Sequence, residues 1–402
     1  MSPSASLKSL LSRVQLVGLV VGLIGLALLA VGAFISTDSF FQAYLKGFTF
    51  WTQVGVGCLG ILMIHHVAGG AWSAVIQRLL EAGAQNLTLM AVLFVPIIFG
   101  MSTLYEWTRP EVLAEDPITS FKTPYLNTPF FLGRTVLYFV IWIGLALMLS
   151  RISRQQDETG DPALGARLKA ISAPGLVVFF LAATFASFDW MMSLEPHWFS
   201  SAYGAIFTVG AGAAAFALII LTMRLVLKHE PFSRVVKTQN INDLGNFQLA
   251  TVMLWAYLAF SQFLIIWSAN LAEFTPWYVA RINGGWEFIS VAMLLFHFVI
   301  PFLMLLSRSL KRNPALLSIV ALIVLVVARP LESLFLIAPA FHPDGLFIHW
   351  LDFAGWLGIG GIWIAAFAWQ LKRQPALIPL HDHRLALTKE TAHGQKAPSH
   401  AH

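Results

Sequence analysis

The stretch FDWMMSLEPHWFSSAYG, from Phe188 to Gly204, joins two long apolar segments of the chain, 172–194 and 202–227. Each segment is as long as the roughly 20 residues that an α-helix needs to cross a hydrocarbon core of about 30 Å. The sequence therefore predicts two membrane-spanning helices joined by a short turn. It also leaves Asp189 inside apolar sequence, where a charge is costly unless it is paired or serves a pathway.

The composition extends this prediction to the whole chain of 402 residues, of which 57% are hydrophobic and only 11% charged. An ordinary soluble protein carries about twice that share of charge. We predict an all-α integral membrane protein with ten transmembrane helices, flanked by an N-terminal segment (1–13) and a polar, disordered tail (372–402). The first helix is too long for a signal-peptide core. The ten helices are expected at 14–36, 47–68, 87–105, 128–150, 172–194, 202–227, 247–269, 286–307, 315–337 and 348–371.

Lysine and arginine gather in alternate loops, which sets the expected orientation. Loops rich in these residues stay on the cytoplasmic side of a membrane. Both termini are therefore expected in the cytoplasm, and the net charge of +5 indicates topology rather than nucleic-acid binding. The clustered cations are Lys8, Arg13, Arg78, Arg151, Arg154, Arg167, Lys169, Arg224, Lys228, Arg234, Lys237, Arg308, Lys311, Arg312, Lys372 and Arg373.

The chain has one cysteine, Cys58. Iron–sulfur clusters need several thiolates, so any such cluster is expected in a partner protein. The predicted depths of His65, His66 and His297 disfavour a bis-histidine haem. We therefore expect no cofactor held covalently or by metal ligands.

Carboxylates, arginine and histidine are expected to converge at the non-cytoplasmic surface. A quinone headgroup needs hydrogen-bond partners for its two oxygens and an apolar trough for its tail, and this mixture supplies both. The same residues suit a proton exit, whereas a buried Asp189–Arg134 ion pair or ordinary interfacial charges are the structural alternatives. The candidate residues are Glu106, Arg134, Asp189, Glu195 and His197.

A second group of candidates marks a proton path through the membrane. Arg329 and Glu332 are three residues apart on one helix, so both side chains face the same way and reduce each other's burial cost. This pair suits either a proton or quinone path or simple helix packing beside Pro330. For the histidines, ordinary capping or satisfied core positions are the alternatives. The other members are His65, His66, His297 and Asp352.

The segment around Asp189, together with NTPFFLGRTVLYFVIW from Asn127 to Trp142, resembles the membrane subunits of bacterial alternative complex III. These belong to the NrfD-like (polysulfide reductase membrane subunit) family, and the likeness is greatest to the smaller of the complex's two such subunits. It covers about residues 14–371 and implies two four-helix bundles plus two additional helices. Asp189, Glu195, His197 and Arg134 are the residues that fall in the matching motif.

The resemblance implies a subunit of a quinol:cytochrome c, or high-potential acceptor, oxidoreductase of the bacterial inner membrane, without redox centres of its own. Menaquinone or ubiquinone is the implied ligand. The implied partners are an iron–sulfur subunit, c-type cytochrome subunits and a second NrfD-like subunit, with a terminal oxidase as a further associate and lipid around the helices. An ion-coupled secondary transporter and a purely structural anchor of the complex are the alternatives.

Overall fold

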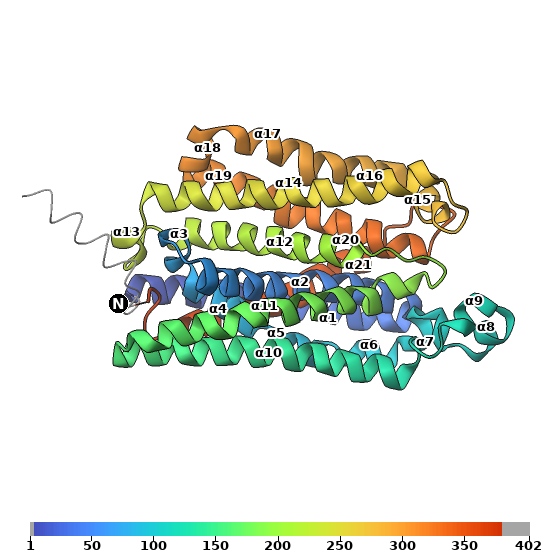
Figure 1. Ribbon diagram of the computed structural model, residues 1–402, viewed down its shortest axis with the longest axis horizontal. Coiled ribbons are helices and arrows are strands. Elements are labelled where there is room, and N and C mark those ends of the chain that lie inside the picture. The colour runs from blue at the N-terminus through green and yellow to red at the C-terminus, as the bar shows by residue number, and fades with distance from the viewer. Residues whose placement is uncertain (1–3, 380–402) are drawn as a thin grey trace, which may run out of the picture.

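The computed structural model describes residues 4–379, and in that range it consists of helices, turns and coil (Figure 1). Ten helical segments within it are long and apolar enough to cross a membrane, which confirms the predicted fold class. The spans are α1 (Ala5–Ile35); α2 (Thr37–Ala68); α4 (Gln77–Gln85), α5 (Leu87–Leu93) and α6 (Val95–Phe99) together; α10 (Thr128–Thr159); α11 (Pro162–Trp190); α12 (Tyr203–Val226); α14 (Thr238–Ala269); α16 (Trp286–Met293), η3 (Leu294–Val299) and α17 (Ile300–Leu306); α19 (Pro314–Leu322), η4 (Ile323–Ala328) and α20 (Arg329–Ile337); and α21 (Trp350–Arg373).

Short helices connect the spans. They are α3 (Ala71–Ala74), α7 (Met101–Leu104), η1 (Glu106–Thr108), α8 (Pro110–Glu115), α9 (Pro117–Phe121), η2 (Met192–Leu194), α13 (Phe232–Val235), α15 (Thr275–Ile282), α18 (Arg308–Arg312) and η5 (Ala338–Ala340).

The spans form two groups of four, with α2 at the centre of the molecule. One group consists of α2, α4–α6, α10 and α11, and the other of α12, α14, α16–α17 and α19–α20. The remaining spans, α1 and α21, pack closely on each other and against α2. This arrangement agrees with the expected two bundles and two additional helices.

Several of the predicted helices are too short at one end. The first helix begins at Ala5 rather than 14, so most of the expected separate segment 1–13 is helical, and α2 begins at Thr37 rather than 47. A helix extends past its apolar stretch where a side chain caps its free N–H groups. Ser4 and Ser36 do so here.

Part of the expected tail is ordered against the bundle. The helix α21 ends at Arg373, and Ala376, Leu377 and Ile378 beyond it are buried. The rest of the tail, 380–402, lies outside the described residues.

The two ends of the bundle differ in character, and we name them after one residue at each. The Arg78 end holds the first turn of α1, the last turn of α21 and the clustered cations; the Glu195 end holds η2, α7–α9 and α15 (Figure 1). The chain crosses between these ends ten times over the described residues.

Candidate functional site

A cavity of about 710 Å³ lies in the second bundle, between α12, α14, α15, α16 and α20. Its walls are almost entirely apolar and aromatic. Tyr257 and Val291, two of its wall residues, are 65% and 56% exposed, so the cavity opens on the lipid-facing surface between α14 and α16. The lining residues that carry polar side-chain atoms are Tyr203, Trp255, Tyr257, Gln262, Trp277, Tyr278, Ser290 and Glu332.

Glu332 forms the inner end of this cavity and belongs to a buried polar cluster. The guanidinium of Arg329 donates to Glu332 Oε2, as the i, i+3 spacing predicts, and also to Gln53 Oε1 on α2. Trp255 Nε1 donates to the other carboxylate oxygen at 2.8 Å. Glu332 is 2% exposed, so its charge is balanced by Arg329 in a site shielded from bulk water.

His297 belongs to the same cluster. Its Nε2 lies 3.6 Å from Glu332 Oε2 and 3.5 Å from Arg329 Nη1, and its ring centroid is 3.7 Å from that of Trp255. The Gln262 amide does not bond His297; it bonds Ser200 and Tyr278 instead.

Two π-helical turns bring these side chains together. The turn η3 contains His297, and η4 ends immediately before Arg329; the two turns pack against each other. A π-turn inserts one extra residue into a helix and rotates the residues after it, and such turns are frequent at functional sites. Gly210 on α12 leaves space for the Arg329 guanidinium, because an added methyl group at this position would clash with it.

The far end of the cavity, toward the Glu195 end, carries hydrogen-bonding groups. Ser200 Oγ donates to Gln262 Oε1 at 2.7 Å, and Gln262 Nε2 donates to the Tyr278 hydroxyl at 3.1 Å. Burial raises the pKa of Tyr278 to about 12, so its phenol stays protonated near neutral pH. The cavity therefore has an acidic side chain at one end and neutral amide and phenol groups at the other.

Asp189 lies outside this cavity, in a closed ion pair. Arg134 donates to both carboxylate oxygens of Asp189, from Nε and Nη2, each at 2.8 Å. The Tyr138 hydroxyl donates to Oδ2 at 2.7 Å, and the Arg134 guanidinium stacks 3.8 Å from the Tyr125 ring centroid. Asp189 is fully buried, so of the two interpretations of this residue the geometry supports the buried ion pair.

The other residues of the predicted outer cluster do not converge with Asp189, which corrects that expectation. Glu195 pairs with the buried Arg281 at 2.6 Å, His197 pairs with Asp116 at 2.6 Å on the surface, and Glu106 is exposed. These residues lie near the ends of predicted helices that reach the same membrane surface, so the sequence indicated one depth for all of them. In the structure, Glu195 and His197 each pair with a residue of a different helix or loop.

Glu195 is nevertheless connected to the cavity. Its partner Arg281 lies 3.6 Å over the ring of Trp277, a cavity wall residue, and donates to the Trp277 carbonyl at 2.8 Å. Trp277 stacks on Trp198 at a centroid distance of 4.3 Å. The Glu195–Arg281 pair thus positions α15 as one wall of the cavity.

Asp352 pairs with Lys46, a residue that sequence reasoning missed. Lys46 was expected in a loop, but α2 begins at Thr37, so Lys46 lies within a spanning helix and is 3% exposed. The apolar residues on both sides of Lys46 already indicated that it lies within a spanning helix. Burial and the Lys46 charge lower the pKa of the neighbouring His342. The salt bridge of Asp352 is thus to Lys46 rather than to a residue of the Glu332 cluster.

His65 begins a second buried polar network at the Arg78 end. Its ring bonds Ser73 Oγ at 2.5 Å and Gln77 Oε1 at 3.1 Å, and Gln77 donates to Glu81 at 3.0 Å. Arg78 then pairs with Glu81 at 2.5 Å and with Asp157. The sequence pointed to the histidines but missed Gln77, Glu81 and Asp157, because partners on other segments have no local signal.

His66 lies beside His65, with ring centroids 4.9 Å apart. On α2, His65 lies 12 residues after Gln53, which bonds Arg329 of the Glu332 cluster. This spacing corresponds to about 18 Å of helix. The two networks are therefore separate clusters, one near the Arg78 end and one in the middle of the membrane-spanning region.

Among residues 4–379, no three His, Cys, Asp or Glu side chains are placed to share a metal ion. No protein-family model matches the chain, and no curated protein sequence is significantly similar to it.

Proposed function

We propose that the chain is a membrane subunit of a quinol-oxidising respiratory complex and that quinol binds in the cavity between α12, α14, α15, α16 and α20. The observation that supports this most is the inner end of the cavity, where Glu332 meets an apolar space open to lipid. A prenylated ring needs such a lateral opening, an apolar tail site and a few hydrogen-bonding groups.

Glu332 suits the proton chemistry of this proposal. Oxidation of a quinol to a quinone releases two electrons and two protons. The Glu332 carboxylate takes up one proton and the other leaves toward water at the Glu195 end, while both electrons pass to an iron–sulfur partner subunit. In this proposal Gln262 and Tyr278, which line the same cavity, hold the second oxygen of the ring.

The wider setting of the proposal follows from the resemblance and from the charges. The clustered cations at the Arg78 end favour a cytoplasmic position for that end, in a bacterial inner membrane. An iron–sulfur subunit, c-type cytochromes and a second NrfD-like subunit are the proposed partners. Isolation of a homogeneous native assembly without iron–sulfur and c-haem subunits would count against this setting.

Quinone binding can be tested on the purified chain with an azidoquinone that labels its site on illumination. Ala259 lines the cavity and Ala250, on the same helix, is exposed outside it. We expect Ala259→Trp to reduce labelling at least tenfold because the indole fills the cavity, and Ala250→Trp to label like the wild type. Equal labelling of the two variants, or labelled peptides from the Asp189 region, would refute the proposed site.

The role of Glu332 is tested separately in the assembled complex. Glu332→Gln keeps the shape of the side chain and its bond from Trp255, so quinone labelling is expected to stay within about threefold of wild type. Quinol oxidation is expected to fall by about 10²–10⁴-fold, the usual contribution of a positioned general base. Full turnover in this variant would remove Glu332 from the chemistry.

A further inference from the structure

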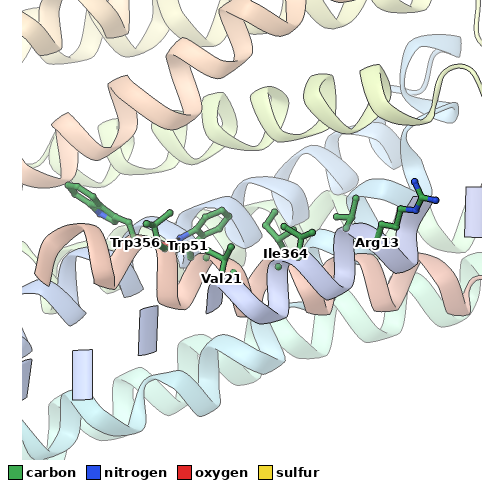
Figure 2. Close-up of a pocket in the computed structure, with 11 residues that line it drawn as sticks. Arg13, Val21, Trp51, Trp356 and Ile364 are labelled. Carbon is green, nitrogen blue, oxygen red and sulfur yellow. Dashed lines mark hydrogen bonds between the residues drawn. The ribbon is translucent and has the colours of Figure 1, made fainter. Parts of the chain in front are cut away.

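A second cavity, of about 420 Å³, runs along the seam between α1 and α21 on the outside of the molecule. Figure 2 shows its lining side chains along α1 and α21, with Trp51 of α2 and Trp356 toward one end and Arg13 at the other. It is a groove rather than a pocket, because wall residues such as Val17 are 62% exposed. It shares no lining residue with the Glu332 cavity.

The groove exists because α1 and α21 touch along their glycines. An added Cβ at Gly18, Gly22 or Gly25 would clash with the backbone of α21. The close approach leaves a trough where Val14, Val17 and Val21 of α1 face Leu357 and Ile364 of α21.

The dimensions of the groove fit one hydrocarbon chain. From Arg13 to Val21 the helix rises about 12 Å, close to the thickness of one leaflet of a roughly 30 Å core.

The charge at the end of the groove fits a phosphate. Arg13 lines the groove at the Arg78 end, and Lys372 and Arg373 end α21 at the same level; Lys372 donates to Gln15 of α1 at 3.0 Å. α1 contains no Asp or Glu, and the one carboxylate of α21, Asp352, lies at its opposite end, paired with Lys46. Among the described residues no ion pair neutralises Arg13.

From this combination we infer that the α1–α21 groove binds one anionic phospholipid of the surrounding bilayer. One acyl chain lies along the valines toward Trp51, and the phosphate is held at Arg13 with Lys372 nearby. A zwitterionic lipid fills the same groove less tightly, since its own cation competes for the phosphate.

Native mass spectrometry of the delipidated chain tests this with two probes, phosphatidylglycerol and phosphatidylcholine of the same acyl chains. We expect one phosphatidylglycerol to bind about fivefold more tightly than phosphatidylcholine, since one cation near a lipid headgroup contributes about that factor. Arg13→Gln is expected to abolish the preference, and Val17→Phe to weaken both lipids at least tenfold by filling the groove.

Two matched variants control for charge and bulk. Arg167→Gln removes an exposed cation at the same end of the bundle, and Val20→Phe adds bulk to an exposed position of α1 outside the groove. Both are expected to bind as the wild type does. Retention of the preference by Arg13→Gln, wild-type binding by Val17→Phe, or a photo-cross-link from position 17 to a protein in native membranes would each overturn the inference.

Discussion

Asp189 and Glu332 are both carboxylates buried in the spanning region, but their surroundings give them different roles. Asp189 accepts two hydrogen bonds from Arg134 and one from Tyr138, and it lines neither the Glu332 cavity nor the α1–α21 groove. Glu332 shares its charge with Arg329 and forms part of a cavity wall. A buried carboxylate that is enclosed by its partners is closed to a ligand, whereas one that also meets open space is available to a ligand.

Asp189→Asn is expected to destabilise the protein by about 3–5 kcal/mol, because it leaves the Arg134 charge buried without a counterion. Unfolding in mixed detergent, followed by circular dichroism, measures this. The double variant Arg134→Met, Asp189→Leu removes both charges and is expected to recover most of the loss. If Asp189→Asn unfolds like the wild type, the ion pair has no structural role.

Asp116 gives a pH dependence at the surface. Hydrogen bonds from Thr119 and then from His197 lower the pKa of Asp116 to about 2, and its Oδ1 caps α9 by accepting from the Ile118 N–H at 3.0 Å. A lowered folded-state pKa means that the stabilisation is present above the ordinary value of about 4 and is lost as pH falls toward about 2.

A spin label on Glu115→Cys reports this locally, because Cys58 is buried and does not compete for label. Label mobility is expected to increase between about pH 4 and pH 2. In Asp116→Ala, which has no side-chain acceptor for the Ile118 N–H, the mobility is expected to be high at every pH. A mobility that is flat with pH in the parent protein would show that the Asp116 cap does not order α9.

At the scale of the elements, helix contacts are set by glycine and by π-turns. The seam between α1 and α21 needs glycine on both sides, since side chains would separate the backbones. In the second bundle, η3 and η4 turn His297 and Arg329 toward each other in helices that would otherwise rotate them apart. The glycine contacts and the π-turns both set the relative positions of helices and side chains, and neither depends on the hydrophobicity of a helix.

Gly22→Ala tests the seam against a matched site. Its Cβ would lie 2.6 Å from the Ile362 backbone nitrogen, so α1 must shift, and we expect a loss of about 1–3 kcal/mol. Gly144→Ala in α10 meets nothing within 4 Å and is expected to be neutral or slightly stabilising. Unfolding of the two variants in parallel measures the difference, and equal stabilities would mean that the seam is not closely packed in solution.

At the scale of the whole molecule, ten crossings bring the first turn of α1 and the last turn of α21 to the same end, where the cations gather. The opposite end carries α8, α9 and α15, and α15 forms one wall of the Glu332 cavity. If the positive-inside rule holds, this cavity lies nearer the outer leaflet side of the bundle.

Cysteine labelling in whole cells checks this orientation. Glu115 and Arg167 are exposed at opposite ends of the bundle, and Cys58 is buried. A membrane-impermeant maleimide is expected to label Glu115→Cys in intact cells and Arg167→Cys only after permeabilisation. The reverse pattern would invert the proposed topology.

The sequence alone determined the ten spans and the pairing of Arg329 with Glu332, because each follows from local hydrophobicity or from spacing along one helix. Helix ends were predicted less well, and with them the depth of Lys46, because capping rather than hydrophobicity decides where a helix begins.

Only the tertiary structure decided which charges meet. All of these contacts join residues of different segments: Arg134 with Asp189, Lys46 with Asp352, Arg281 with Glu195, and His297 with Glu332. The cavity at Glu332 likewise arises between helices, at a height set by two π-turns. Contacts of this kind depend on the rotation and register of each helix. A membrane helix is apolar on all faces, so its pattern of apolar residues does not fix either of them.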